Sequence, residues 1–289
     1  MKRAEKKIGT PGTLYVVGTP IGNLEDITLR ALRILSEVNW IAAEDTRRTR
    51  ILLRHHDLET PPLISCFEHN EQRRTSSLVD RLSKGENGAL VTSAGTPTVS
   101  DPGYRLVSAA AKAGIPVAPV PGPTAAAAAL SASGLATDAF VFLGFCPKKP
   151  GQMERFLQKL VAEEKTMIFY ESPTRILSLL EAAETVFGDR RGVLGREMTK
   201  RHEEFIRGRL SEIRGRLQDR PAVKGECTLL VAGATEARKP SDAQLMAPVA
   251  QLLKEGMSVS EAAKTIAERY GAPKARVYKM ALEMKKGQL

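Results

Sequence analysis

Short apolar segments alternate with amphipathic segments over the first half of the chain. Each apolar segment spans four or five residues and is bounded by Gly, Pro or polar residues, which is typical of a strand buried on both faces. The predicted strands lie at 14–17, 40–43, 63–67, 89–92 and 117–120. Between them we predict a helix capped by Thr28 and helices over 71–82 and 104–113. These β-α repeats predict a mostly parallel, doubly wound sheet.

A second α/β set begins after a break in the pattern near residues 136–138. Its predicted strands lie at 140–145, 167–170, 193–196 and 228–232. Between 203 and 217, two short basic segments punctuated by Gly predict antiparallel, hairpin-like elements and therefore a mixed sheet. We therefore expect an N-terminal α/β domain over 12–135 and a second α/β domain over 136–235.

The C-terminal part of the chain has a third pattern. Residues 235–241 are polar, contain a proline and are predicted to form a linker to a helical tail over 241–289. The tail reads as three helices, the last two over 259–270 and 274–285, around a tight Gly-Ala-Pro turn. Two interpretations stay open: a helix-turn-helix that contacts RNA phosphates, or a small helical cap with a solvated basic face.

The net charge of the chain indicates what kind of partner it binds. The chain carries 43 Lys and Arg against 33 Asp and Glu, a formal net charge of +10. Such an excess indicates a polyanionic partner, although a merely solvated basic surface gives the same count. No apolar run approaches the roughly 20 residues of a membrane span, and none resembles a signal-peptide core. We expect a cytoplasmic protein.

The cysteines and histidines do not indicate a metal site. Cys66, Cys146 and Cys227 are far apart in apolar stretches and are expected to be buried thiols. The four histidines lack the spacing of metal ligands, and His55-His56 is expected to end a surface helix. We predict no metal.

Three loops at predicted strand ends carry unusual chemistry. They are 18–23, 93–97 with the adjoining 100–103, and 121–125, all rich in Gly, Pro and small polar residues. Each alone resembles an ordinary turn, but parallel sheets bind ligands at the carboxyl ends of their strands, so together they favour a cofactor site. Their spacing differs from the dinucleotide fingerprint, the phosphate-binding P-loop and the nucleophile elbow. A nicotinamide cofactor, nucleotide hydrolysis and esterase chemistry are therefore disfavoured.

Two polar clusters also follow predicted strands, at 44–48 and 68–71. Asp45, Thr46 and Asn70 are good helix N-caps, and capping is the favoured interpretation for Asn70. The same carboxylates, imidazole and guanidinium groups also supply a candidate general base and phosphate anchors.

Several motifs carry a resemblance to a known family. They are Leu-Tyr-Val-Val-Gly-Thr-Pro-Ile-Gly-Asn-Leu, Ala-Ala-Glu-Asp-Thr-Arg, Glu-His-Asn-Glu, Ala-Gly-Thr-Pro, Ser-Asp-Pro-Gly-Tyr-Arg-Leu, Phe-Tyr-Glu-Ser-Pro and Glu-Met-Thr-Lys. From about residue 12 to 233 the chain resembles the ribosomal RNA small subunit methyltransferase I family, within the tetrapyrrole-methylase superfamily. One departure is Ser93, which stands before Ala-Gly-Thr-Pro where this family usually has Asp.

The resemblance implies two α/β domains with S-adenosylmethionine between them, usually in a homodimer. It implies 2′-O-methylation of a cytidine in the decoding region of 16S rRNA within the small ribosomal subunit. The implied cofactor-binding residues are Pro20, Ile21, Thr96, Pro97, Val99, Thr124, Ala125, Tyr170, Glu171, Arg196, Glu226 and Cys227.

Methyl transfer needs the acceptor hydroxyl positioned and its proton removed. Our hypothesis is that Asp45, Glu68 or His69 accepts or orients that proton. Phosphate contacts are expected from Arg47, Arg48, Arg50, Lys274, Arg276 and Lys279. Two rival functions stay open: a tetrapyrrole methyltransferase of the same fold, and a non-catalytic RNA-binding assembly factor. The basic charge disfavours the first, and failure to bind S-adenosylmethionine would favour the second.

Overall fold

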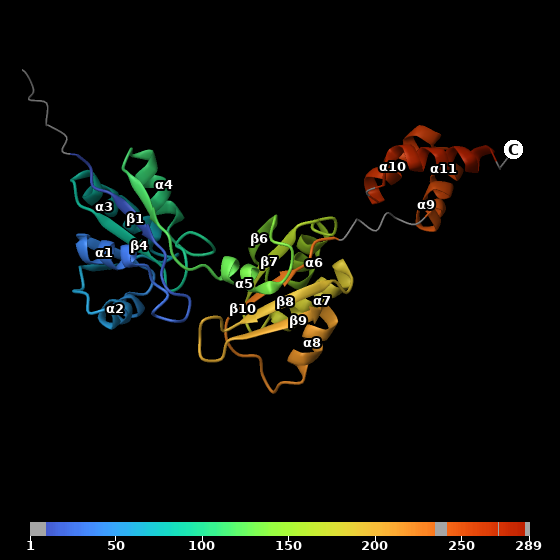
Figure 1. The fold of residues 1–289 in the computed structure, drawn as a ribbon. Coiled ribbons are helices and arrows are strands. Elements are labelled where there is room, and N and C mark those ends of the chain that lie inside the picture. Colours follow the sequence, from blue (N-terminus) through green and yellow to red (C-terminus); the bar gives the residue numbers. More distant parts are fainter. Residues whose placement is uncertain (1–9, 235–241, 271, 287–289) are drawn as a thin grey trace, which may run out of the picture.

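The computed structural model describes residues 10–234, 242–270 and 272–286, which form two five-stranded sheets followed by a group of three helices (Figure 1). The linker expected at 235–241 lies outside the described residues. The α/β fold class with a parallel first sheet, a mixed second sheet and a helical tail is confirmed.

All strands of the first sheet run parallel, in the order β3-β2-β4-β1-β5. They are β1 (Leu14–Val17), β2 (Trp40–Ala43), β3 (Leu63–Ser65), β4 (Gly88–Val91) and β5 (Val117–Val120). The doubly wound prediction is confirmed because β1 lies between β4 and β5, the two strands of this sheet that come last along the chain. The carboxyl ends of these three strands are therefore neighbours.

Helices cover both faces of this sheet. Helix α1 (Leu29–Glu37) and helix α2 (Thr46–His55) cover one face, and α3 (Glu71–Ser83) and α4 (Tyr104–Lys112) cover the other. The alternation of side chains along β2 sends Ile41 toward the first pair and Trp40 toward the second. Thr28 caps α1 as predicted, since its Oγ1 accepts a hydrogen bond from the Ala31 N–H at 3.1 Å.

The sequence prediction was wrong at the end of β3. The strand stops at Ser65 instead of residue 67, and the Asn70 side chain makes no cap hydrogen bond to α3. Its Oδ1 accepts from the Phe67 N–H at 2.9 Å and its Nδ2 donates to the Ser65 carbonyl at 3.2 Å. Asn70 thus closes the turn before the helix, and the backbone leaves the sheet early.

Glu71 instead caps another helix, α4. Its carboxylate is buried, and Oε1 accepts from the N–H groups of Arg105 at 2.7 Å and Leu106 at 3.2 Å. The residue before α4 is Gly103, which has no side chain to do this. Because the negative charge also faces the positive end of the helix, it stabilises both α4 and its packing on α3.

We expect Glu71→Ala to lower the free energy of unfolding by about 2 kcal/mol, because two buried N–H groups lose a charged acceptor. Urea titration measures this loss. Gln72→Ala, at the next, exposed position of α3, is the control and is expected to change stability by less than about 0.5 kcal/mol. Equal losses in both variants would contradict the capping role.

The second sheet has the order β6-β7-β10-β8-β9, with β6 and β7 parallel and the other pairs antiparallel. Its strands are β6 (Phe140–Phe145), β7 (Thr166–Glu171), β8 (Arg191–Arg196), β9 (Glu204–Arg209) and β10 (Cys227–Val231). The mixed sheet predicted from the basic segments is confirmed. The second of those segments, however, is helix α8 (Leu210–Gln218), because Leu210, Ile213 and Leu217 recur at helical spacing and are buried.

Two layers of helices sandwich the second sheet. Helices α6 (Pro150–Gln158) and α7 (Ile176–Phe187) pack with α8 against one face. The other face receives α5 (Ala125–Ser133), which follows β5 of the first sheet. Ala129 and Leu130 of α5 contact the core around Ile168 and Leu230. Helix α5 therefore joins the two α/β units, and it lies between them in Figure 1.

The C-terminal helices have a core of their own. Helices α9 (Asp242–Lys254), α10 (Val259–Tyr270) and α11 (Lys274–Lys286) pack around Leu245, Val249, Ile266 and Val277. The predicted helices over 259–270 and 274–285 are confirmed.

Candidate functional site

The loops that leave β1, β4 and β5 are joined to one another. Thr19 and Gly95 exchange two backbone hydrogen bonds, of 2.9 and 3.0 Å. Gly18 and Gly122 approach so closely that a Cβ atom on Gly18 would lie 2.8 Å from the Gly122 Cα. The three loops singled out from the sequence thus form one continuous surface at the sheet edge.

This surface faces the second sheet across a cavity of about 350 Å³, here called the junction cavity. The first unit supplies the loops after β1, β4 and β5, and the second supplies the ends of β6, β7 and β10. Most of the residues predicted to bind the cofactor line it, namely Ile21, Thr96, Val99, Thr124, Ala125, Tyr170, Glu171, Glu226 and Cys227.

Three predicted cofactor residues lie elsewhere. Pro20 lines a neighbouring cavity, while Pro97 and Arg196 line neither of the two. Arg196 forms an ion pair with Glu204 at 3.0 Å and donates to the Lys224 carbonyl at 2.9 Å. Its guanidinium thus links β8 to β9 and to the segment before β10.

Hydrogen bonds fix several polar groups of the junction cavity. The Tyr170 hydroxyl accepts from the Ala126 N–H at 3.0 Å, at the start of α5, and burial raises its pKa. The Glu171 carboxylate accepts from the Ser172 N–H at 2.8 Å and pairs with Arg175 at 3.0 Å. These contacts lock the shape of the cavity wall.

The cysteines are buried thiols, as predicted. Burial raises the pKa of Cys66 and Cys227 to about 11 and that of Cys146 to about 12. Cys227 therefore lines the junction cavity as a neutral, weakly polar group, and thiolate chemistry is disfavoured there.

Sequence reasoning missed Asp101, which also lines the junction cavity. Burial raises its pKa to about 7, and the nearby carboxylates of Glu44 and Glu226 add to the effect. A carboxyl group that titrates near neutrality in a cavity is a candidate for proton chemistry. The Ser-Asp-Pro-Gly motif was a signal in the sequence, but the spacing did not show that its aspartate is partly buried beside two other acids.

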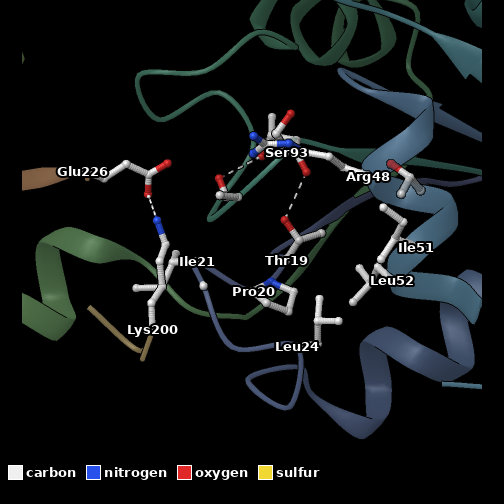
Figure 2. A pocket seen from close by; sticks show the side chains of 14 residues that line it. Thr19, Pro20, Ile21, Leu24, Arg48, Ile51, Leu52, Ser93, Lys200 and Glu226 are labelled. Carbon is white, nitrogen blue, oxygen red and sulfur yellow. Dashed lines mark hydrogen bonds and ion pairs between the residues drawn. The ribbon is translucent and has the colours of Figure 1, made fainter. Parts of the chain in front are cut away.

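A second cavity of about 300 Å³ adjoins the first and is bordered by helix α2; we call it the α2 cavity. Both cavities are lined by Ile21, Ala94 and Glu226. Figure 2 shows Arg48, Ile51 and Leu52 of α2 on one side and the Lys200–Glu226 pair on the other. Its further lining is Thr19, Pro20, Gly22, Leu24, Thr49, Thr92 and Ser93.

The two cations of the α2 cavity differ in their partners. The Lys200 ammonium pairs with Glu197 at 2.8 Å and with Glu226 at 3.1 Å. Arg48 is exposed, and no ion pair to its guanidinium occurs among the described residues. Arg48 is therefore the cation most available to an anionic ligand.

The loop after β1 also touches the loop between β8 and β9. The Asn23 N–H donates to Thr199 Oγ1 at 3.0 Å, and a Cβ on Gly22 would lie 2.5 Å from the Lys200 Cγ. Glu197 and Thr199 adopt positive φ angles of 50° and 65°. Strained residues of this kind persist where surrounding contacts fix them, often at functional sites.

The three predicted proton acceptors lie outside both cavities. Asp45 caps α2, and its carboxylate bonds to the Arg47 side chain and backbone, which lowers its pKa to about 2. Glu68 and His69 are exposed in the turn after β3. The structure thus gives Asp45 a capping role and places the other two on the surface.

The predicted phosphate contacts are distributed over two surfaces. Of the three predicted arginines, all on α2, Arg47 pairs with Asp45 at 3.0 Å, Arg48 lines the α2 cavity and Arg50 is exposed. On α11, Lys274 and Lys279 are exposed, whereas Arg276 pairs with Asp242 of α9 at 2.7 Å.

The described residues as a whole hold neither a metal cluster nor a membrane-spanning helix. Among them, no group of three or more His, Cys, Asp or Glu side chains is arranged to hold a metal ion. None of their helices has the length and apolar character to cross a membrane.

Comparisons with known proteins agree with this arrangement. The model of the Tetrapyrrole (Corrin/Porphyrin) Methylases matches residues 13–214, and that of the RsmI C-terminal HTH domain matches 239–285. The ribosomal RNA small subunit methyltransferase I of Synechocystis sp. is 45% identical over 276 residues, which cover 94% of this chain and 98% of that protein. The protein of the same name from Streptococcus pyogenes serotype M1 is 44% identical, with coverages of 96% and 97%.

Solved structures share the fold at lower identity. The methyltransferase CobJ superposes with a TM-score of 0.58 at 23% identity, covering 77% of this chain and 95% of its own. Uroporphyrin-III C-methyl transferase from Thermus thermophilus, solved with S-adenyl homocysteine, gives a TM-score of 0.54 at 21% identity, with coverages of 76% and 97%. These likenesses concern the fold alone.

Proposed function

We propose, from the premise that this chain belongs to the ribosomal RNA small subunit methyltransferase I family of the tetrapyrrole methylases, that it methylates a ribose 2′-hydroxyl of a cytidine in the decoding region of 16S rRNA. It is an S-adenosylmethionine-dependent enzyme. The observation that carries the proposal is the pair of adjoining cavities, which share Ile21, Ala94 and Glu226. One cavity takes the methyl donor and the other takes the acceptor nucleotide.

The junction cavity fits S-adenosylmethionine in its chemistry. Its small loop residues, Gly95 and Ala125, allow a flat ring to approach the backbone, and its carboxyl groups suit a ligand with positive charge. When bound, the cofactor supplies an electrophilic methyl group on a positively charged sulfur. The residues around it hold and orient it, and the wall that includes Tyr170 limits access of water.

The α2 cavity fits a nucleotide of an unpaired RNA strand. Pro20, Leu24 and Ile51 supply an apolar surface, and Thr19 and Ser93 belong to its polar side. Sequence-specific RNA recognition usually targets unstacked bases, which such a mixed surface can receive. Arg48 would hold a phosphate beside the cavity.

The tail and the assembly complete the proposal. The match of residues 239–285 to a helix-turn-helix model supports an RNA contact by α11, where Lys274 and Lys279 are exposed. By family likeness the protein acts as a cytoplasmic homodimer on the small ribosomal subunit.

The decisive experiment is transfer of labelled methyl from S-adenosylmethionine to small subunits from a strain that lacks this protein. We expect one 2′-O-methylcytidine in the decoding region, located by nuclease digestion and mass spectrometry. Small subunits that already carry the modification are the control and should accept no label. Cofactor binding without label in RNA, together with label in a tetrapyrrole, would replace this proposal by the small-molecule one.

A further inference from the structure

Asp101 differs from the other acids of the junction cavity in its lack of a partner. Glu171 pairs with Arg175, and Glu226 pairs with Lys200. Among the residues that the structure describes, the Asp101 carboxyl makes neither a hydrogen bond nor an ion pair. A partly buried acid without a partner is costly unless a ligand completes its surroundings.

The loop backbone that holds Asp101 in place is conformationally strained. Its loop is closed by the Thr98 N–H, which donates to the Pro102 carbonyl at 3.3 Å. Thr98 and Ser100 adopt positive φ angles of 74° and 63°, which residues other than Gly rarely adopt. The loop also packs on the bulge of β6, where a Cβ on Gly144 would lie 2.9 Å from Ser100 Oγ. The structure therefore fixes this carboxyl at the junction of the two sheets.

The charged and titratable groups around Asp101 are acids. Glu44 follows β2, and its carboxylate accepts from the Ser93 N–H at 2.9 Å, while Glu226 precedes β10. On β7, the hydroxyl of Tyr170 has its pKa raised by burial and, to a smaller extent, by Asp101. Such surroundings favour the neutral acid in the free protein, and a positive charge in the cavity would favour the carboxylate.

We infer that Asp101 is a catalytic residue: its carboxylate faces the positively charged sulfur of bound S-adenosylmethionine and takes the proton of the acceptor hydroxyl. This inference rests on the proposed function. The hydroxyl oxygen forms the new O–CH₃ bond, and the pair of the broken S–CH₃ bond stays on sulfur. The O–H pair stays on oxygen while the proton moves to Asp101. Sulfonium and carboxylate become thioether and carboxylic acid, so the summed charge of the two groups is zero before and after.

The test compares wild type, Asp101→Asn and Asp101→Glu by calorimetry with S-adenosylmethionine and with S-adenosylhomocysteine. Titrations in buffers of different ionisation enthalpy count the protons released. The wild type should release about half a proton at pH 7 on binding the sulfonium, because the pKa of free Asp101 is about 7. It should release less with the thioether, and Asp101→Asn should release none with either. Asp138→Asn, at an exposed position outside both cavities, is the control.

The pH dependence has a definite sign. The affinity of the wild type for S-adenosylmethionine should fall as the pH falls through 7, since the protonated acid must first lose its proton. At subsaturating S-adenosylmethionine, the rate of small-subunit methylation should rise as the pH rises across the same window. Asp101→Asn should lose both dependences and at least about 100-fold in turnover, the lower range for proton-transfer catalysis. Asp101→Glu keeps a carboxyl and should retain part of the proton release.

Other results would overturn the inference. If folded Asp101→Asn, checked by thermal melting, discriminates the sulfonium from the thioether as the wild type does, Asp101 does not face the sulfur. If it retains turnover while Glu68→Gln or His69→Ala loses it, the proton acceptor lies in the turn after β3. A wild type that binds the cofactor with the expected proton release but leaves rRNA unlabelled contradicts the proposed function, not the placement of Asp101.

Discussion

Replacing Gly122 by alanine is expected to weaken S-adenosylmethionine binding about 100-fold, by analogy with the loss of rate that a displacement of about 1 Å at a site can cause. A Cβ on Gly122 would lie 2.8 Å from the carbonyl oxygen of Gly18. Both contacting groups are backbone, so no flexible side chain can yield. The loops after β1 and β5 must separate, and each of them lines the junction cavity, through Ile21 and through Thr124.

Equilibrium binding of the cofactor measures this loss, with circular dichroism to verify that the variant is folded. The matched control is Gly215→Ala in helix α8, where nothing lies within 4 Å of the added Cβ. We expect unchanged affinity for this control and a small gain in stability, since Ala has the higher helix propensity. Wild-type affinity in folded Gly122→Ala would show that the packed loops do not shape the cofactor site.

The second large effect is expected from Arg48→Glu, which should lower kcat/KM for small subunits about 100-fold. A charge-assisted hydrogen bond contributes about 1.5–3 kcal/mol, and the reversed charge adds repulsion of the phosphate. Lys200 is expected to compensate little, because its ammonium already pairs with Glu197 and Glu226. The change should lie mainly in KM, and the affinity for S-adenosylmethionine should stay unchanged.

Arg50→Glu tests whether the effect belongs to the α2 cavity. Arg50 lies on the same helix and is exposed, but it lines neither cavity. It should reduce activity only a few-fold and in a salt-dependent manner, as a long-range charge effect does. Equal losses in the two variants would mean that α2 attracts RNA through general charge, without a particular contact by Arg48.

The sequence predicted the elements where apolar pattern and punctuation agree. The bounds of β1, β2 and β5 match the structure, because each is a short apolar run between Gly, Pro or polar residues. Helix α8 was missed, since Gly208 and Gly215 with several arginines suggested hairpins, whereas the buried face of Leu210, Ile213 and Leu217 decides the helix. Burial of these three side chains in the core thus outweighs the local tendency of the two glycines to form turns.

The candidate site was predictable in its loops and less so in its side chains. The strand order places β1 between β4 and β5. Because the strands are parallel, the loops at their carboxyl ends are expected to meet at one edge of the sheet. Which acid enters the cavity depends on how residues far apart in sequence pack where the two units meet. Asp45 follows a strand and caps α2, which is one of the two roles that the sequence left open for it. Asp101 becomes distinctive only once Glu44 and Glu226 lie beside it.

The position of α5 has a consequence for synthesis of the protein. The first sheet is complete when β5 has emerged from the ribosome, but the apolar face of α5 packs on the core that contains Leu230 of β10. At roughly 5–20 residues per second, synthesis of the intervening strands takes about 5–20 s. During that time the sheet on which α5 docks is incomplete, because β10 is its last strand to be made. The nascent chain therefore passes through a stage in which its N-terminal half is folded, unable to hold cofactor and open to chaperones.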